Sequence, residues 1–368
     1  MLIKQNIIIV HSDDKSMCGQ LRMHCMTQLG AAGRTGDFQF VVSPEEIQDE
    51  YILNHTYAIV TNKVMTERDA SMVCSYGRKK KKFGYRIVVD YDDVVWDVFG
   101  ESLVPDYNTG VAFDAVQVGK IIDSCLRYVD EVTLSTRYLA TKWLQRFDSK
   151  HLKLSVVPNY LPRAWYGSRK RRVDADVVRP RIVYGGSPTH YSGDDRGDFA
   201  GPWIPWLIDA VSDGKAELHM FGRKEDTHPM FFDIYDLIQW HEPTSAWEWG
   251  STLRDVGGDL YIAPLAENQF NCCKSNIKLL EACACGMAFM GSSWSAAEPY
   301  WEAHPLSFVS NHWSEDQLMH RFEEVCRQDN FNSILEHQET LIDKYWLEND
   351  KNIGNILKTW CRGGVRIS

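Results

Sequence analysis

The chain has 368 residues, of which 44% are hydrophobic and 24% are charged, and its formal net charge at pH 7 is −10. This length exceeds one average domain, so two domains are expected. The composition excludes a disordered chain and a membrane protein. The negative charge argues against a generally basic nucleic-acid-binding surface but is compatible with local basic patches.

The beginning of the sequence, MLIKQNIIIVHSDD, combines one lysine with an apolar run that is too short for a secretory signal. No other stretch approaches the length of a membrane span. The ten cysteines form no CxxC pair, which favours reduced, buried thiols in a reducing compartment. We therefore expect a cytoplasmic protein without stable membrane association.

Short apolar runs alternate with helical patterns in the first half of the chain, which predicts a parallel sheet covered by helices on both faces. The expected strands are Asn6–Ser12, Thr56–Asn62, Tyr85–Tyr91, Glu131–Thr136 and Lys153–Pro162. The expected helices are Gly19–Leu29, Val116–Val129 and Arg137–Phe147.

A charged stretch without helical periodicity, Ser168–Pro180, interrupts this pattern and indicates a linker. The strand–helix pattern then restarts, and everything from about Glu315 is expected to be helical. The expected strands of this second pattern are Arg181–Ser187, Ala216–Gly222, Asp259–Leu265 and Met287–Ser293. The sequence thus predicts two α/β domains, at 1–168 and 181–340, facing a cleft. Ligands of such sheets bind beyond the carboxyl ends of the strands.

Two loops after strands of the first domain carry charged residues. In HSDDKSMCGQLRMH, Gly19 at a helix start and Arg22 on its first turn suit a phosphate, although a solvated arginine is the alternative. In VVDYDDVVWD, the acidic residues Asp90, Asp92 and Asp93 could bind a metal, orient sugar hydroxyls or act as a base. The upstream run GRKKKKFGYR could offset their repulsion or be a solvated helix end.

Two loops of the second domain have features of a diphosphate site. In YGGSPTHYSGDD, small residues including Gly186 let a ligand approach the backbone, and Ser187 could hold a diphosphate. His190 either contacts the ligand or is structural.

The stretch PLAENQFNCCKSNIKLLEACACG is the second of these loops. Lys274 and Lys278 are four residues apart and are expected to share a helix face, with Glu281 close to it. At a helix start the two lysines would neutralise a diphosphate, and Glu281 could accept two hydrogen bonds from a ribose diol. The alternative is a surface salt bridge.

KLLEACACG resembles the C-terminal motif of retaining GT-B glycosyltransferases of family 4, and FNCCKSNIKLLE resembles a phage and bacterial subgroup with F-N-x-x-K-S-x-x-K-x-x-E. The segments GGSPTH, CGQLRM, DYDD, VTLST and VVPNYLP support the resemblance. One departure is Cys273, which stands where the family usually has a glutamate eight residues before Glu281. Glu267 is a candidate for a partial replacement.

The resemblance implies a GT-B fold of two Rossmann-like domains, with C-terminal helices at 341–368 crossing back to the first domain. It implies transfer, with retention, from a nucleotide sugar such as a UDP- or GDP-sugar, and no required metal. The leaving diphosphate would be stabilised by Lys274, Ser275 and Lys278. Glu281 would hold the ribose and Trp240 would stack on the base. The expected catalytic residues are Asp92, Asp93 and Lys274; the expected donor-binding residues are Gly19, Arg22, Gly186, Ser187, His190, Trp240, Asn271, Lys274, Ser275, Lys278 and Glu281.

The acceptor stays open between two classes. Phage relatives suggest a hydroxymethylated base in viral DNA, which would place the protein in a host cytoplasm, with GRKKKKFGYR and SRKRR on DNA phosphates. A glycan or lipid-linked acceptor is the rival. Three other hypotheses also remain: a non-catalytic DNA-binding protein, an NAD-dependent oxidoreductase, and a GT-A enzyme with DYDD as its metal motif.

Overall fold

The computed structural model describes residues 6–12, 19–97, 103–105, 112–167, 179–186, 197–199, 201–222, 229–293 and 299–362. The chain divides into two compact units. Unit 1 comprises Met1–Pro162, Cys273–Ser275 and Leu347–Ser368, and unit 2 comprises Arg163–Cys272 and Asn276–Trp346. The predicted boundaries 1–168 and 181–340, and the predicted cleft, stay predictions.

Unit 1 is built on a parallel sheet with the strand order β2-β1-β3-β4-β7-β8. The strands are β1 Ile7–His11, β2 Gln39–Val42, β3 Thr56–Asn62, β4 Arg86–Tyr91, β7 Glu131–Leu134 and β8 Lys153–Val156. A separate antiparallel pair joins β5 Leu103–Pro105 to β6 Ala112–Asp114. The central strands β1, β3 and β4 contain the buried apolar runs Ile7–Val10, Ala58–Val60 and Ile87–Val89, as expected for a sheet covered on both faces.

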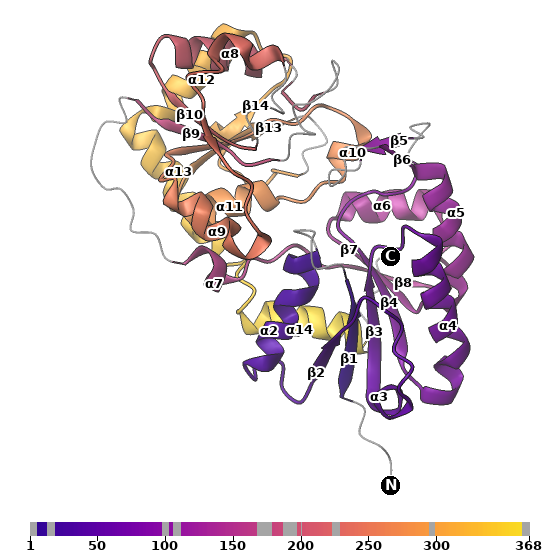
Figure 1. Ribbon diagram of the computed structural model, residues 1–368. Coiled ribbons are helices and arrows are strands. Elements are labelled where there is room, and N and C mark those ends of the chain that lie inside the picture. The colour runs from indigo at the N-terminus through magenta and orange to yellow at the C-terminus, as the bar shows by residue number, and fades with distance from the viewer. Residues whose placement is uncertain are drawn as a thin grey trace. The chain divides into compact units, whose positions relative to one another are not determined.

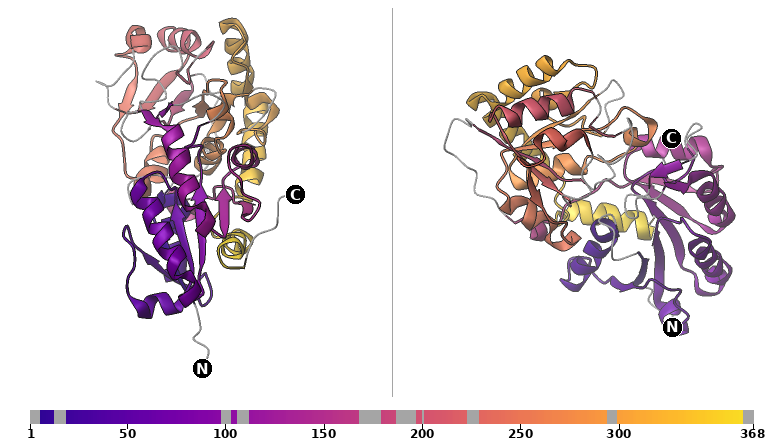
Figure 2. Two further views of the ribbon diagram at one scale, coloured as in Figure 1. Left: turned by 90° about the vertical axis from the view of Figure 1, so that its right-hand side faces the viewer. Right: turned by 45° about the horizontal axis from the view of Figure 1, so that its top comes forward.

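Helices connect and cover these strands (Figure 1). They are the π-helical turn η1 Gln20–His24, α2 Cys25–Ala31, α3 Glu50–His55, α4 Glu67–Phe83, α5 Ala115–Cys125, the short turn η2 Leu126–Tyr128, α6 Arg137–Arg146, α14 Asp350–Leu357 and the π-helical turn η7 Lys358–Arg362. The yellow helix α14 lies beside the indigo helix α2 in Figure 1 and in the right-hand view of Figure 2. Hydrogen bonds from Arg34 to Glu348 and Asp350 join these parts of the chain. The expected return of the C-terminal helices to the first domain is thus confirmed for α14.

Unit 2 repeats the plan with the strand order β11-β10-β9-β12-β13-β14, again parallel. Its strands are β9 Arg181–Tyr184, β10 Glu217–Phe221, β11 Gln239–His241, β12 Leu260–Ala263, β13 Ala288–Ser292 and β14 Phe308–Val309. Its helices are α7 Arg163–Tyr166, α8 Trp203–Ser212, η5 Pro229–Ile234, α9 Ala246–Asp255, α10 Gln269–Cys272, α11 Ile277–Cys285, η6 Pro305–Ser307, α12 Glu315–Cys326 and α13 Gln328–Ile342.

Alternating strand residues of unit 2 face opposite helical layers. Ile182 and Tyr184 of β9 belong to a buried cluster with side chains of α8, α12 and α13. Tyr261 of β12 instead bonds Glu281 of α11 on the other face. This period of two is what a pleated strand imposes. The expected α/β class, with a parallel sheet in each half of the chain, is therefore confirmed.

The strand order indicates where a ligand site is expected in each sheet. Chain direction across the sheet reverses between β1 and β3 in unit 1 and between β9 and β12 in unit 2. Open α/β sheets bind ligands beyond the carboxyl ends of the strands at these reversal points. The segments that follow β1, β3, β9 and β12 are therefore the first places to look for a site.

Candidate functional site

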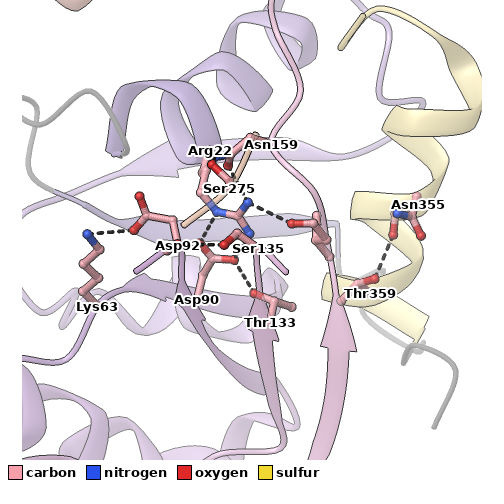
Figure 3. A network of polar contacts seen from close by, with 11 residues as sticks. Arg22, Lys63, Asp90, Asp92, Thr133, Ser135, Asn159, Ser275, Asn355 and Thr359 are labelled. Atoms are coloured by element: carbon pink, nitrogen blue, oxygen red, sulfur yellow. Dashed lines mark hydrogen bonds and ion pairs between the residues drawn. The ribbon is translucent and has the colours of Figure 1, made fainter. Parts of the chain in front are cut away.

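A buried ion pair lies at the carboxyl ends of the unit 1 strands (Figure 3). The Arg22 guanidinium donates two hydrogen bonds to Asp90, from Nε to Oδ2 at 2.7 Å and from Nη2 to Oδ1 at 2.6 Å. Its Nη1 donates to the carbonyl of Val157 and to Asn159 Oδ1. Thr133 donates to the same Asp90 carboxylate. Arg22, expected from the sequence to bind phosphate, thus directs its guanidinium to groups of its own unit.

Lys63 lies next to the other two acidic residues of this loop, Asp92 and Asp93. Its Nζ lies 2.7 Å from Asp92 Oδ1 and 4.0 Å from Asp93 Oδ2. The Asp92 side chain is 4% exposed and that of Asp93 is 25% exposed. Of the three acidic residues predicted for this loop, Asp93 is therefore the one that solvent and ligands reach most readily. Sequence reasoning missed Lys63, although it follows directly on strand β3.

Several charges determine the ionisation of Asp93. Burial and the adjacent carboxylate of Asp92 raise the pKa of Asp93, while Lys274, Lys63 and Arg22 act against this rise. A carboxyl group whose pKa is shifted by burial and by specific charged partners is a candidate functional group.

Lys274 and Lys278 do not share a helix face, which corrects the sequence prediction. Helix α10 ends at Cys272 and α11 begins only at Ile277, so Lys274 lies between two helices. The intervening segment Cys273–Ser275 clusters with unit 1, whereas Lys278 belongs to unit 2. Two hydrogen bonds explain the break, because Thr136 donates to the Cys273 carbonyl and Asn159 Nδ2 donates to Ser275 Oγ at 2.7 Å.

In unit 2, aromatic side chains surround the carboxylate of Glu281. Its Oε1 accepts a hydrogen bond from Trp249 Nε1 at 2.7 Å and a longer one from the Tyr166 hydroxyl. Its Oε2 accepts from the Tyr261 hydroxyl at 3.0 Å. Burial raises the pKa of Glu281, and these hydrogen bonds with the charge of Lys278 act in the opposite direction. Glu281 is thus held in one orientation by α7, α9 and β12.

The glycines after β9 make room for aromatic side chains. A Cβ atom at Gly185 would lie 2.5 Å from the Tyr261 hydroxyl, and one at Gly186 would lie 2.4 Å from the Tyr184 hydroxyl. The Tyr261 hydroxyl has one hydrogen, which the Gly185 carbonyl at 3.2 Å shares with the Glu281 carboxylate. The protein's own side chains approach the backbone closely at this turn, and a role of Gly186 in donor binding stays a prediction. Ser187 and His190 lie outside the described residues.

The remaining predicted donor residues have internal partners. Asn271 donates from Nδ2 to Asp198 and to the carbonyl of Ala266, which fixes the turn after β12. Trp240 packs against the buried core of unit 2. Lys278 places its Nζ 4.4 Å from the centre of the Tyr184 ring. Roles for these residues in donor binding stay predictions.

Gly19 precedes η1 and has helical backbone angles. Its predicted contact with phosphate stays a prediction. Glu267, the candidate replacement for the missing family glutamate, pairs with His312 at 3.3 Å, and the side chains are 45% and 84% exposed. This pairing places Glu267 on the surface of unit 2.

The lysine run of α4 lies at the opposite end of the unit 1 strands from the acidic loop, which favours the helix-end interpretation over an offset of the acidic charges. The helix leads from the carboxyl end of β3 to the amino end of β4, so its last turns lie at the amino edge. Three of its lysines are paired with acidic residues, in the pairs Lys79–Glu46, Lys80–Asp130 and Lys82–Glu50. The run therefore does not offset the repulsion of Asp92 and Asp93.

Within the described ranges, no three His, Cys, Asp or Glu side chains gather into a group that could hold a metal ion. The same part of the chain contains no helix with the length and apolarity that crossing a membrane requires.

No family model and no curated protein matches this sequence. Solved structures do match the fold. A glycosyltransferase from Rickettsia africae is 11% identical with a TM-score of 0.61, over 96% of this chain and 98% of that chain. Anabaena Alr3699/HepE, solved with UDP, is 8% identical with a TM-score of 0.60, over 96% and 100% of the two chains.

The E. coli trehalose-6-phosphate structure bound with UDP-2-fluoro glucose is 9% identical with a TM-score of 0.56, over 98% and 100% of the two chains. These similarities extend over nearly the whole of each chain, and at such low identity they concern the fold. This chain therefore has the two-unit α/β fold of GT-B glycosyltransferases, as the sequence predicted.

Proposed function

We propose that this protein is a glycosyltransferase that moves a sugar from a nucleotide sugar to an acceptor hydroxyl with retention. The observation that carries the proposal is the combination of the fold with KSNIKLLE, which follows β12 in the chain and whose Lys278 and Glu281 lie on α11 of unit 2. Anabaena Alr3699/HepE, which shares the fold, has been solved with UDP and with UDP-glucose. UDP-sugars are therefore the first donors to test, and GDP-sugars the second.

Each motif residue has a proposed role. Lys274 and Ser275 stabilise the negative charge that develops on the leaving diphosphate, which is often the largest contribution in such reactions. Lys278 adds a second positive charge. Glu281 accepts hydrogen bonds from the ribose, because an ionised carboxylate has about four lone-pair positions and its protein partners occupy only part of them. Asp93 contacts the acceptor. The transfer itself requires no metal in this proposal.

For the acceptor, a hydroxymethylated base in DNA is the proposal taken from the sequence, and a glycan or lipid-linked hydroxyl is its rival. The DNA proposal had two basic runs in its favour. The run on α4 is paired with acidic residues at the edge of the sheet away from Asp93, and SRKRR lies outside the described residues. The resemblance to phage enzymes is what still supports DNA, so both classes belong in the first assay.

A thermal-shift titration with UDP, GDP, ADP, CMP and UDP-glucose tests the donor. A ligand present at about 100 times its Kd adds about 2.7 kcal/mol to the free energy of unfolding. We expect UDP or GDP to raise the Tm and Lys274→Ala to weaken that nucleotide by at least about tenfold, which is about 1.4 kcal/mol. The control is Lys215→Ala, since Lys215 pairs with Asp213 on the surface of unit 2.

The stabilising donor is then incubated, in labelled form, with duplex DNA that contains hydroxymethylcytosine and with a panel of oligosaccharides. Label on one acceptor class with retained anomeric configuration supports the proposal and names the class. The proposal fails if no nucleotide stabilises the protein, or if the Lys274 variant binds the nucleotide as tightly as the Lys215 control.

A further inference from the structure

Lys63 occupies the reversal point of the unit 1 sheet. It is the first residue after β3, and β3 lies between β1 and β4 in a sheet whose chain direction reverses between β1 and β3. Arg22 follows β1 on the other side of this point. In unit 1 this is the position where an open α/β sheet presents residues to a ligand.

The backbone of Lys63 has an uncommon conformation. Its φ angle is +44°, and it is the one residue other than glycine with positive φ among those that the structure describes. Asparagine, aspartate and glycine adopt this left-handed region most readily, whereas a lysine is disfavoured there. The conformation is held by a hydrogen bond from the Lys63 amide to the Asp90 carbonyl. Strain of this kind concentrates at functional sites.

The side chain of Lys63 contacts two acidic residues of the loop after β4. The ammonium group lies against Asp92 at 2.7 Å and near Asp93 at 4.0 Å. Asp92 is nearly buried and receives the close contact, while Asp93 keeps 25% of its side chain exposed. One carboxylate is therefore held by the lysine, and the other stands beside the same positive charge and remains accessible.

We propose that Lys63 is a positioning residue for the transfer reaction, which fixes Asp92 and keeps Asp93 in place to accept a hydrogen bond from the acceptor hydroxyl. This inference rests on the proposed function. The acceptor oxygen forms its bond to the anomeric carbon as the bond from that carbon to the diphosphate oxygen breaks. The hydroxyl proton leaves with the diphosphate, so Asp93 orients the hydroxyl and ends the reaction unchanged.

Asp93 accepts this hydrogen bond best when it is ionised. The charges around Asp93 therefore matter, because they shift its pKa. Burial and Asp92 raise the pKa of Asp93; Lys274 from Cys273–Ser275, Lys63 from the end of β3 and Arg22 from η1 lower it. Loss of the Lys63 charge therefore raises the pKa of Asp93. The acidic limb of any activity that needs ionised Asp93 moves to higher pH as a result.

The direct test follows Asp93 by NMR in the full chain labelled with 13C at the aspartate carboxyl carbons. Asp93→Asn assigns the signal. Lys63→Met removes the charge and keeps the length of the side chain, and Lys63→Asn removes the charge but suits the left-handed backbone. We expect the Asp93 midpoint to move to higher pH in both variants. Lys79→Met, which breaks a similar pair with Glu46 at the far edge of the sheet, is the control.

The second readout is hydrolysis of UDP-glucose, in which water takes the place of the acceptor. A midpoint shift of one pH unit lowers the rate on the acidic limb about tenfold. We expect this loss in kcat for both Lys63 variants, with unchanged UDP binding and recovery at high pH. An Asp93 midpoint that stays in place in both variants overturns the inference. If wild-type protein binds no nucleotide, the proposed function fails, yet the NMR titration still decides whether Lys63 controls Asp93.

Discussion

Arg22 and Asp90 form a buried ion pair in which the two side chains keep 4% and 2% of their surface exposed. Both carboxylate oxygens and three guanidinium nitrogens take part in hydrogen bonds. Such a pair is expensive to break, since the partner that remains is a buried charge without compensation. The pair therefore holds η1 to β4, and with them the first residues of the acidic loop.

Replacement of Arg22 by alanine is expected to lower the free energy of unfolding by about 3–5 kcal/mol. The matched control is Arg34→Ala. Arg34 pairs with Asp350 where the side chains are 45% and 93% exposed, and a surface pair of this kind contributes about 0–1 kcal/mol. Urea unfolding of both variants measures the difference. Similar losses in the two would show that Asp90 finds another partner or water.

Glu281 predicts a pH dependence of stability. Burial raises its pKa above the ordinary value of 4.5, so the folded protein holds this proton more tightly than the unfolded chain. The resulting stability is complete below the ordinary pKa and is lost as the pH rises through the raised one.

Glu281→Gln keeps the shape and removes the titration. We expect the wild type to lose stability relative to this variant as the pH rises above the ordinary pKa of 4.5, by about 1.4 kcal/mol for each unit of the pKa rise. Urea unfolding of both proteins over a series of pH values provides the measurement. A difference between the proteins that is constant with pH would contradict a raised pKa.

Helix α11 ends at a position where the backbone conformation favours glycine. Gly286 follows Cys285 with a φ angle of +65°, and its amide donates to the carbonyl of Cys283. A left-handed residue is the common way to end a helix and to satisfy its last carbonyls. The glycine of the family-like motif therefore fixes where α11 stops and β13 begins.

Two glycine-to-alanine changes are expected to have opposite signs. Gly286→Ala puts a side chain at positive φ and should destabilise by about 1–2 kcal/mol. Gly354→Ala lies within α14, where a Cβ atom meets nothing within 4 Å, and should stabilise by about 0.5–1 kcal/mol. The Tm of each variant tests this. Destabilisation by Gly354→Ala would contradict the open space around a Cβ atom at this position.

The strands that the sequence predicted lie inside their sheets, with the exception of the edge strand β8. The expected run Thr56–Asn62 coincides with β3, and Tyr85–Tyr91 differs from β4 by one residue. The strands that were missed in the two six-stranded sheets, β2, β11 and β14, are edge strands, and the separate pair β5–β6 was missed as well. An edge strand is covered less completely, so it lacks the continuous apolar run that identifies a central strand.

The candidate site was less predictable than the strands. Spacing placed Lys274 on a helix with Lys278, but the hydrogen bonds that break this helix come from Thr136 and Asn159, far away in the sequence. Lys63 carries no motif, and only the strand order shows that it lies at a reversal point. Tertiary contacts of this kind are not encoded in local patterns.

At the scale of the whole molecule, acidic residues outnumber basic ones and the net charge is −10. The basic run of α4 accordingly finds acidic partners within its own unit. Runs of basic residues read in isolation suggest an anionic partner, yet Lys79, Lys80 and Lys82 face acidic residues of their own unit. The charge of a run thus has to be judged together with the residues that the fold places opposite it.

Unit 1 is assembled from separate parts of the chain, which has a consequence for its synthesis. Asn355 of α14 donates to Tyr160, and the Leu347 amide bonds the Leu161 carbonyl. Segment Asn276–Trp346 completes unit 2 before Leu347 has been made. Because translation adds residues from the N-terminus at about 5–20 per second, the unit whose strands leave the ribosome first is the last to become complete. During synthesis, unit 1 therefore still lacks α14 at the time when unit 2 already has its whole sequence.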